Sequence, residues 1–411
     1  MKNKFQKIVV MGLGYIGLPT ASILATKGHS VLGVDVNSTT VEVINSGRIH
    51  IVEPDLDTLV QSAVSSGKLR ASLVPEEADT FILAVPTPFK KENGNDKAPD
   101  LSYIEAATLS IIPFLKKDNL IILESTSPVG TTEFVQKIIY KQRPELKNNV
   151  YVAHCPERVL PGQILRELVE NDRIIGGTSK IAVSKAVSLY KSFCNGNILE
   201  TDSRTAELSK LVENSFRDVN IAFANELSLV CDRLGIDVWE TIELANRHPR
   251  VNILQPGPGV GGHCIAVDPW FIISSAPDQS RLIRTAREVN DSKPLWVIDE
   301  ICRKAKKFQA PVIGCLGLTF KANIDDMRES PAMEIVKKLY SSKIGKVMAC
   351  DPNVATGKTD FPIYPLDEVL AQADIIVLLV DHSEFAAIDE NLLKDKVVFD
   401  TKGFFRNENR N

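Results

Sequence analysis

The stretch Lys7-Ile-Val-Val-Met11-Gly12-Leu-Gly14-Tyr-Ile-Gly17 decides the fold of the first part of this chain. The run from Lys7 to Met11 is compact and β-branched, which predicts a buried strand. Three glycines follow at once, and a helical pattern then continues to Lys27. Glycines in such a turn let backbone amides approach a pyrophosphate at the amino end of a helix. The stretch therefore indicates a dinucleotide-binding fold, in which Gly12, Gly14 and Gly17 contact the cofactor.

A carboxylate follows at the position that this fold requires. A second apolar run, Ser30–Val34, ends at Asp35, which is 18 residues beyond Gly17. In dinucleotide-binding folds this carboxylate accepts hydrogen bonds from the ribose hydroxyls. The same charge would repel the additional phosphate of NADP. Asp35 thus favours NAD as the cofactor.

Strand-like runs recur further along the chain with helical spacing between them, as a doubly wound parallel sheet requires. They are Thr80–Val85, Leu120–Leu123 and Val150–Ala153, and a polar or proline-rich turn follows each one. Open α/β sheets bind their ligands outside the carboxyl ends of the strands. Thr87 and Thr126 lie in these turns, where they either cap the turn or contact a ligand.

The middle of the chain is mostly helical. One long helix is expected from Ser203 to about Leu234, ended by Gly235. Lys210, Asn214 and Arg217 fall at i, i+4 and i+7 of this helix and share a face. That face is either solvated or the wall of a site, and the pattern alone favours a solvated face. A helical segment between two α/β units is also a natural element for dimer formation.

A shorter helix, Val238–Asn246, leads to the loop Gly257–Pro269, which has four glycines in its first six residues. Such a loop needs unusual dihedral angles or a close backbone approach. Cys264 within it is a candidate nucleophile, with Asp268 nearby, because a thiolate is reactive and its formation depends on such surroundings. A lone cysteine is more often a small buried hydrophobe, but the glycine cluster and the rest of the chain favour reactivity. For His263, packing is favoured over a role in activating the thiol.

The last part of the chain predicts a second α/β unit without the glycine fingerprint. Ser330 and Pro331 suit the N-cap and first position of a helix, and Lys321 and Arg328 place positive charge nearby. A nucleotide diphosphate could bind there. The expected strands are Ala310–Leu316, Lys346–Cys350, Ile375–Val380 and Val397–Asp400.

Composition bounds the class of protein. A chain of 411 residues, with 44% apolar and 24% charged residues, predicts a soluble protein of two or three domains. Its net charge of −4 gives no general attraction to nucleic acid or to an anionic membrane. The seven cysteines are scattered, without a Cys-x-x-Cys pair, which argues against a metal site or disulfide framework and for a reducing cytoplasm. No apolar run approaches the ~18 residues of a membrane span, and the amino-terminal run is expected to be a strand rather than a signal peptide.

Six stretches together resemble the UDP-glucose/GDP-mannose dehydrogenase family, and they span nearly the whole chain in order. Around the cysteine loop, the sequence is closer to the bacterial N-acetylmannosamine enzymes of that family than to the glucose enzymes. The stretches are Gly12–Pro19, Glu124–Gly130, Pro156–Gly162, Glu207–Glu226, Arg247–Pro269 and Phe320–Pro331.

The resemblance implies an NAD-dependent four-electron oxidation, in which the C6 alcohol of UDP-N-acetyl-D-mannosamine becomes a carboxylate through a cysteine thiohemiacetal and thioester. It implies Cys264 as nucleophile, Lys210 as proton donor and acceptor, Asn214 as a stabiliser of negative charge, and Asp268 or Glu157 at the hydrolytic water. The implied UDP-sugar contacts are Arg158, Val159, Lys210, Asn214, Arg217, His248, Arg250, Gly261, Phe320, Lys321 and Lys402. The implied NAD contacts include Tyr15, Ile16, Asp35, Thr87, Thr126 and Arg328.

The expected architecture is of the α/β class, with two Rossmann-like doubly wound parallel-sheet domains joined by a central helical domain with one long helix. The expected division is residues 1–200 for NAD, 201–300 for dimerisation with the catalytic lysine and cysteine, and 301–411 for the UDP-sugar. A homodimer or higher homo-oligomer serving surface polysaccharide synthesis is expected. The alternatives are UDP-N-acetylglucosamine or UDP-glucose as substrate, a two-electron hydroxyacid dehydrogenase, and a non-catalytic nucleotide-sugar sensor.

Overall fold

The structure is a computed structural model that describes residues 5–90, 97–160, 162–262 and 264–406. His263 lies outside these ranges, as does the polar stretch 93–96, for which the sequence predicts a surface loop. The chain forms two compact units, which are described in turn. Unit 1 comprises Met1–Val212 with Trp270–Ser275, and unit 2 comprises Glu213–Pro269 with Ala276–Asn411.

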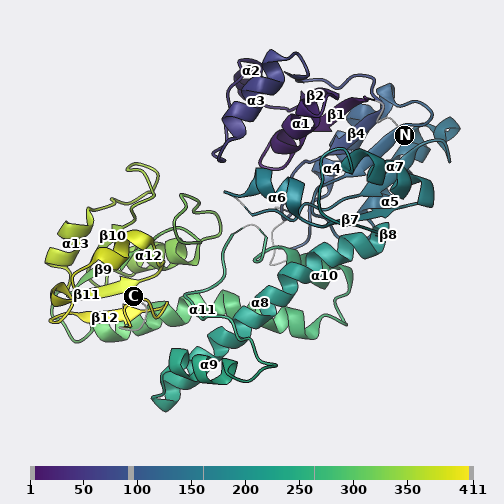
Figure 1. The fold of residues 1–411 in the computed structure, drawn as a ribbon. Coiled ribbons are helices and arrows are strands. Elements are labelled where there is room, and N and C mark those ends of the chain that lie inside the picture. Colours follow the sequence, from purple (N-terminus) through teal and green to yellow (C-terminus); the bar gives the residue numbers. More distant parts are fainter. Residues whose placement is uncertain (1–4, 91–96, 161, 263, 407–411) are drawn as a thin grey trace. The chain divides into compact units, whose positions relative to one another are not determined.

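Unit 1 is built on an eight-stranded sheet of order β3-β2-β1-β4-β5-β6-β7-β8, with helices on both faces (Figure 1). Apolar residues are buried on each face of the sheet, because both faces are covered. Its strands are β1 (Lys7–Met11), β2 (Ser30–Val34), β3 (Leu69–Ser72), β4 (Thr80–Leu83), β5 (Leu120–Leu123), β6 (Tyr151–His154), β7 (Arg173–Gly177) and β8 (Ile198–Asp202). Its helices are α1 (Gly17–Thr26), α2 (Ser38–Asn45), α3 (Leu56–Ser65), α4 (Ser102–Ile111), η1 (Ile112–Phe114), α5 (Thr131–Gln142), η2 (Pro144–Leu146), α6 (Ile164–Glu170) and α7 (Lys180–Tyr190).

One strand pair of this sheet departs from the parallel pattern expected from the sequence. Strand β7 runs antiparallel to β6, with Ala153 opposite Gly177, and β8 is again parallel to β7. A parallel crossover would carry the chain back along the sheet, whereas the segment between β6 and β7 contains only the seven-residue α6. The residues that follow β6, Glu157 among them, therefore stay near the carboxyl edge of the parallel strands.

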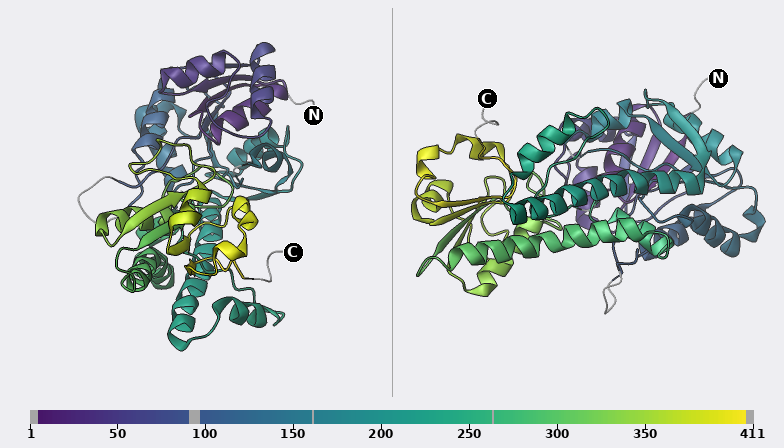
Figure 2. Two further views of the ribbon diagram at one scale, coloured as in Figure 1. Left: turned by 90° about the vertical axis from the view of Figure 1, so that its left-hand side faces the viewer. Right: turned by 90° about the horizontal axis from the view of Figure 1, so that it is seen from below.

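The long helix expected from Ser203 is confirmed as α8 (Ser203–Leu234), and Gly235 follows it with φ of +70°. Helix α9 (Val238–Asn246) also matches the expectation. Helix α11 (Arg281–Ala305) was not predicted and contains Pro294 in its interior. Within unit 2, α8 and α11 run side by side (Figure 2) and exchange buried hydrogen bonds. The remaining helix of this part is α10 (Asp268–Ser275).

Unit 2 also contains an all-parallel sheet of order β10-β9-β11-β12. Helices α11 and α12 pack on one face of it and α13 on the other. Ser330 caps α12 as expected, since its hydroxyl accepts a hydrogen bond from Met333 N at 3.2 Å. No helix in the described ranges is both long and apolar enough to cross a membrane. The elements are β9 (Val312–Leu316), β10 (Lys346–Cys350), β11 (Ile375–Leu378), β12 (Val397–Asp400), α12 (Pro331–Ser342), α13 (Leu366–Gln372), η3 (Ser383–Ala387) and η4 (Glu390–Leu392).

Candidate functional site

The turn between β1 and α1 has the geometry of a dinucleotide site. Gly12 has φ of +91°, and a Cβ added to it would lie 2.7 Å from the Ala84 carbonyl oxygen. A Cβ on Gly17 would lie 1.9 Å from the Gly12 carbonyl oxygen, so α1 can begin this close to the turn only with glycine there. Gly14 is different, because nothing lies within 4 Å of its Cβ position. The turn is therefore open to an approaching ligand at Gly14.

Asp35 is fixed against this turn by backbone amides. Its Oδ2 accepts from Leu13 N at 3.0 Å and its Oδ1 accepts from Asn37 N at 2.9 Å. A carboxylate has four acceptor positions, so two amides leave capacity for ribose hydroxyls. Tyr15 is exposed beside Gly14 and Ile16 is half-buried. The turn and its carboxylate thus fit the ribose and pyrophosphate of a dinucleotide.

Thr87 and Thr126 are brought together, but in a way that favours turn capping. The Thr87 hydroxyl donates to the Thr126 carbonyl oxygen at 2.6 Å, which ties the turn after β4 to the turn after β5. Ser125 makes a second tie, since its hydroxyl donates to the Val85 carbonyl oxygen at 2.6 Å. A contact of either threonine with the cofactor stays a prediction.

Helix α8 is anchored in unit 1 by Glu207, which the sequence analysis did not single out. The Glu207 carboxylate accepts from Gly130 N at 2.6 Å, and from Thr132 N and the Thr132 hydroxyl at 2.7 and 2.6 Å. These groups form the amino end of α5, where the helix dipole favours an anion. Lys210 is half-buried one helical turn further along α8. Glu207 therefore fixes where α8, and with it Lys210, passes the turn that carries Thr126.

Glu157 belongs to a buried charged cluster at the end of β6. The Arg173 guanidinium donates to Glu157 Oε2 at 3.2 Å and lies over the Tyr190 ring at 4.8 Å. The Tyr190 hydroxyl donates to Glu124 Oε1. Burial, with a smaller contribution from Glu157, raises the pKa of Glu124 to about 7. Two carboxylates share one guanidinium here, so the cluster retains a proton close to neutral pH.

The residues after Glu157 are less enclosed. Arg158 N donates to Glu157 Oε1 at 2.8 Å, and its guanidinium donates to the Asp172 carbonyl oxygen at 3.2 Å. Arg158 and Val159 are both half-buried. The predicted substrate residues Arg158 and Val159 thus follow directly on the predicted water-activating carboxylate.

In unit 2 the glycine loop packs closely on the start of α12. A Cβ on Gly261 would lie 2.4 Å from the Glu329 carbonyl oxygen and 2.7 Å from Pro331 Cδ. A Cβ on Gly259 would lie 3.0 Å from both Pro294 Cγ and Pro331 Cβ. The glycines are therefore required by this close approach, as the sequence analysis expected.

A pocket of about 260 Å³ lies where the loop meets the second sheet. It joins loop residues such as Gly259 to Phe320, Lys321 and Lys402, and Pro331 at the amino end of α12 also lines it. Lys402 pairs with Asp381 at 3.5 Å. Two lysines and a helix amino end outweigh the one carboxylate in this lining, Asp381, so the pocket keeps the positive character that a diphosphate needs. Three predicted UDP-sugar residues, Phe320, Lys321 and Lys402, are thus brought together.

Cys264 lies at the far end of the glycine loop and is exposed. Its carbonyl oxygen accepts from Val267 N at 3.1 Å and Asp268 N at 2.9 Å, so the first turn of α10 starts from this residue. Asp268 is buried, and its Oδ2 accepts from Asn214 Nδ2 at 2.6 Å. The predicted pair Asn214 and Asp268 is therefore in direct contact, on α8 and at the end of the loop.

The other cysteines are poorly placed for nucleophilic chemistry. Burial raises the pKa of the Cys155, Cys315 and Cys350 thiols to about 12. Cys231 is buried as well, and Cys194 and Cys302 are partly covered. Since a thiolate is the attacking species, exposure distinguishes Cys264 from the other six.

The remaining predicted residues lie on the surface of unit 2. Arg217, His248 and Arg250 are exposed, on α8 and on the turn after α9. Arg328 is also exposed, and its guanidinium forms a bidentate pair with Asp326 at 2.6 to 3.0 Å. Their contacts with substrate or cofactor stay predictions.

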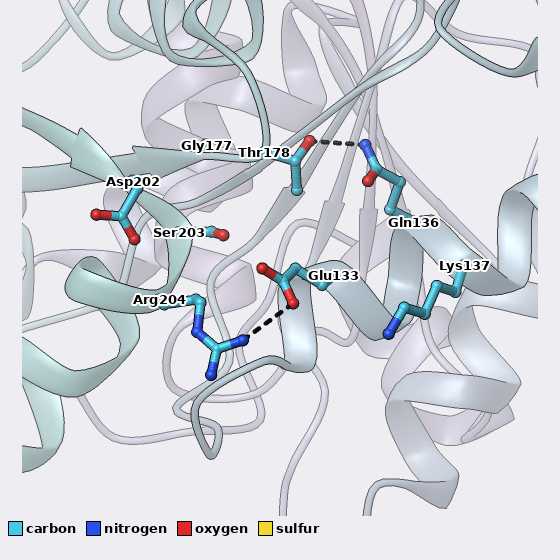
Figure 3. Close-up of a pocket in the computed structure, with 8 residues that line it drawn as sticks. All are labelled: Glu133, Gln136, Lys137, Gly177, Thr178, Asp202, Ser203 and Arg204. Carbon is cyan, nitrogen blue, oxygen red and sulfur yellow. Dashed lines mark hydrogen bonds and ion pairs between the residues drawn. The ribbon is translucent and has the colours of Figure 1, made fainter.

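A further pocket, of about 390 Å³, is lined by none of the predicted site residues (Figure 3). It lies in unit 1 between helix α5, the end of β7 and the start of α8. Arg204 pairs with Glu133 across it at 3.3 Å, and Gln136 donates to Thr178 at 2.7 Å. Four of the side chains drawn there thus bind one another in two pairs.

Three consecutive matches to known families cover most of the chain. Residues 6–194 match the NAD binding domain of the UDP-glucose/GDP-mannose dehydrogenase family, residues 204–292 its central domain, and residues 314–407 its UDP binding domain. The chain belongs to this family. It is an NAD-dependent nucleotide-sugar dehydrogenase, and the stretch that matches the NAD binding domain contains the glycine turn and Asp35.

Similar proteins are named for different nucleotide sugars. An NDP-N-acetyl-D-galactosaminuronic acid dehydrogenase from Ralstonia nicotianae is 56% identical, over 98% of this chain and 96% of that protein. A UDP-N-acetyl-D-mannosamine dehydrogenase from Escherichia coli (strain K12) is 54% identical, over 98% of this chain and all of that protein. The solved structure of a UDP-N-acetyl-mannosamine dehydrogenase from S. aureus is 45% identical with a TM-score of 0.87, covering 97% of this chain and 96% of its own.

The open side of the glycine turn predicts different outcomes for two alanine substitutions. Gly14→Ala should leave the unfolding midpoint unchanged and weaken NAD binding about tenfold or more, because the added methyl group stands where a pyrophosphate approaches the backbone. Gly17→Ala should instead destabilise the dehydrogenase by about 1–3 kcal/mol, since its methyl group collides with Gly12. Thermal unfolding and calorimetric titration with NAD would measure both effects. Similar destabilisation by the two substitutions would contradict this account of the turn.

The buried Glu124 predicts a pH-dependent effect on stability. Its folded-state pKa of about 7 lies above its ordinary value of 4.5, so the folded protein loses stability as the pH rises through this interval. Glu124→Gln cannot ionise and keeps an acceptor for Tyr190. The free energy of unfolding of Glu124→Gln, relative to that of the wild type, should therefore rise between pH 5 and pH 8 by up to about 3 kcal/mol. Glu170→Gln, at an exposed position of α6, is the control, and a difference independent of pH would refute the assignment.

Proposed function

We propose that this dehydrogenase oxidises the C6 alcohol of UDP-N-acetyl-D-mannosamine to UDP-N-acetyl-D-mannosaminuronate, for use in a surface polysaccharide. The observation that carries the chemistry is Cys264, an exposed thiol at the end of a glycine loop that is packed against the lysine-lined pocket of unit 2. NAD, when bound, accepts one hydride in each of two oxidations. One alcohol, two NAD⁺ and one water thus give one carboxylate, two NADH and three protons.

The proposed steps assign a distinct task to each side chain. Lys210 takes the proton of the C6 hydroxyl while the carbon loses its hydride. The Cys264 thiolate then adds to the aldehyde carbon, and Lys210 returns a proton to the oxygen, which gives a thiohemiacetal. A second loss of proton and hydride from this group leaves a thioester. Water adds to the thioester carbon and expels the thiolate, which leaves the carboxylate.

The amide of Asn214 is proposed to stabilise negative charge on the sugar oxygen together with Lys210, which is one turn away on the same helix face. Asn214 already donates to Asp268, so Asp268 fixes the orientation of that amide. Glu157 and Asp268 are the carboxylates proposed to orient or deprotonate the hydrolytic water. Glu157 is suited to this because Arg173 holds one oxygen while the cluster around Glu124 can retain a proton.

The UDP group is proposed to bind in the pocket between the glycine loop and the second sheet, with its diphosphate near the amino end of α12. Arg158, Val159, Arg217, His248 and Arg250 are proposed to complete the substrate site. Tyr15, Ile16, Thr87, Thr126 and Arg328 are proposed to contact NAD. We retain the division into residues 1–200, 201–300 and 301–411 as a proposal for the functional domains.

A second substrate is favoured by a specific observation. The relative from Ralstonia nicotianae, at 56% identity, is named for N-acetyl-D-galactosaminuronic acid rather than for N-acetylmannosamine. The two sugars differ in the configuration of ring substituents, while both carry an alcohol at C6 and are linked to a nucleoside diphosphate. The same residues would therefore perform the same chemistry on either one.

Product stoichiometry with a panel of nucleotide sugars tests the proposed function. UDP-N-acetylmannosamine should give two NADH per uronate and the highest kcat/KM, above its galactose- and glucose-configured N-acetyl epimers and UDP-glucose. Cys264→Ala should form no uronate and retain the wild-type Kd for NAD, because the thiol is not part of the glycine turn. A higher kcat/KM for the galactose-configured sugar would support the second substrate. Uronate formation by Cys264→Ala would refute the thioester route.

We also propose that the dehydrogenase is a homodimer that pairs through α8. Phe216, Phe223, Val230 and Leu234 are spaced by seven, seven and four residues and share one face of this helix. They are 68%, 52%, 47% and 65% exposed. Such a stripe on a long helix fits the same stripe of a second copy.

Charge placed on this stripe should break the dimer. Phe223→Glu should be monomeric in sedimentation velocity at micromolar concentration, because two like charges would face each other across the two-fold axis. Leu392→Glu, an exposed apolar position on η4, should leave the dimer intact. A wild-type protein that sediments as a monomer would rule out the proposal.

A further inference from the structure

We propose that Asn225 on α8 and Asn290 on α11 are positioning residues for the cysteine loop, and that they keep the aldehyde committed to Cys264 between the two oxidations. This inference rests on the proposed function and adds a role for two buried amides outside its set of residues. Both amides lie in unit 2, together with the loop that they hold.

The loop is fastened to α8 at its entry by a side-chain amide. Asn225 Oδ1 accepts from Gly257 N at 2.9 Å, and Gly257 is the first glycine of the loop. Asn225 is fully buried, so this bond is shielded from competition with water. Gly257 has no side chain that could form a further contact. The position of the loop entry therefore depends on the orientation of one carboxamide.

That orientation is set by Asn290 on the neighbouring helix. Asn225 Nδ2 donates to Asn290 Oδ1 at 2.8 Å, and Asn290 Nδ2 donates to Asp218 Oδ1 at 2.8 Å. Asp218 is paired with Arg287, and all of these side chains are buried. A carboxylate can only accept, so Asp218 forces the Asn290 amide nitrogen toward itself and the Asn290 oxygen toward Asn225. The Asn225 oxygen is then left to face Gly257 N.

The same helix face also holds the exit of the loop. Asn214 on α8 donates to Asp268, four residues after Cys264. Asn214, Asp218 and Asn225 fall at i, i+4 and i+11, which is one face of the helix. Cys264 therefore lies on a segment that α8 holds at both ends. Between these ends, Pro294 of α11 packs against the loop, with its Cγ 3.0 Å from the Cβ position of Gly259.

A second asparagine on α8 holds the segment before the loop. Asn220 Oδ1 accepts from Leu254 N at 3.1 Å, and Asn220 Nδ2 donates to the Asn252 carbonyl oxygen at 3.3 Å. Asn220 is half-buried, whereas the buried Asn225 bonds to both Asn290 and Gly257 and so connects the first glycine of the loop to the buried side chains of α11. A buried series of hydrogen bonds thus runs through Arg287, Asp218, Asn290 and Asn225 and ends on the backbone of the loop that carries the proposed nucleophile.

The chemical consequence lies in the second half of the reaction. The first oxidation needs only the alcohol, the cofactor and Lys210, whereas capture of the aldehyde needs the sulfur of Cys264 at bonding distance from the carbon. If the loop moved from its position, capture of the aldehyde by Cys264 would therefore slow more than formation of the aldehyde. Aldehyde would then leave the enzyme, and NADH would be produced without a matching amount of uronate. A residue that contributed only to stability would lower the amount of active enzyme and leave the product ratio at two.

The test uses the full-length enzyme with Asn225→Leu, which keeps the side-chain volume and removes both hydrogen bonds. With UDP-N-acetylmannosamine and NAD, we expect the ratio of NADH to uronate to rise from two to three or more. We expect kcat for uronate to fall about tenfold. O-Benzylhydroxylamine should trap the released sugar aldehyde as an oxime, which mass spectrometry separates from a hydroxamate formed on a thioester. The Kd for NAD should stay at the wild-type value, because the glycine turn belongs to unit 1.

Three further variants make the outcome decisive. Asn290→Ser leaves Asn225 in place and should give the same rise in ratio to a smaller extent, even if Asn225→Leu does not fold. Ser228→Ala removes the bond from Lys293 to Ser228 between the same two helices, touches no loop atom and should keep the ratio at two. Cys264→Ala, in the same assay, tests the proposed function separately. A ratio that stays at two in both asparagine variants, without trapped aldehyde, would overturn the positioning role.

Discussion

The structure depends on one constraint, which is that each buried polar side chain on α8 must find a partner. Helix α8 carries Glu207, Asn214, Asp218 and Asn225 in fully or nearly fully buried positions. An unpaired buried amide or carboxylate is costly, so these groups determine what lies against the helix. Glu207 forms hydrogen bonds with the amino end of α5, Asn214 with Asp268, and Asn225 with Gly257. In each unit, α8 thereby fixes the segments that carry predicted functional residues.

Much of the fold could be predicted from local sequence patterns. Strands β1, β2, β5, β10 and β12 and helices α8 and α9 lie where the sequence placed them, because their apolar runs and end signals are strong. The antiparallel strand β7 was not predicted, since strand direction depends on the path of the connection and not on the strand's own residues. Helix α11 was also not predicted, because Pro294 in its interior reads as a helix breaker, and in the structure that ring packs against Gly259.

In the candidate site, too, local sequence patterns predict some of the residues and not others. The glycine turn, Asp35 and the loop around Cys264 have recognisable spacing, and the pocket beside the loop gathers Phe320, Lys321 and Lys402 as expected. Glu207, Asn225 and Asn290 have no such local signal. Their partners lie between 32 and 77 residues away in sequence, and a polar residue on a helix reads as solvated until its partner is known. Glu207 could have been suspected, since it lies within a motif that also contains Lys210.

Exposure and rigidity make opposite demands on the thiol proposed as nucleophile, and the loop architecture meets both. A thiol held in a packed core would be well positioned but unreactive, as the raised pKa values of Cys155 and Cys315 illustrate. A thiol on an unanchored loop would ionise readily, but it would have no fixed position from which to attack an aldehyde. The glycine loop exposes the Cys264 side chain, while buried amides bind the Gly257 backbone before it and the Asp268 side chain after it. The polar core of unit 2 therefore gives an exposed residue the positional order that normally requires burial.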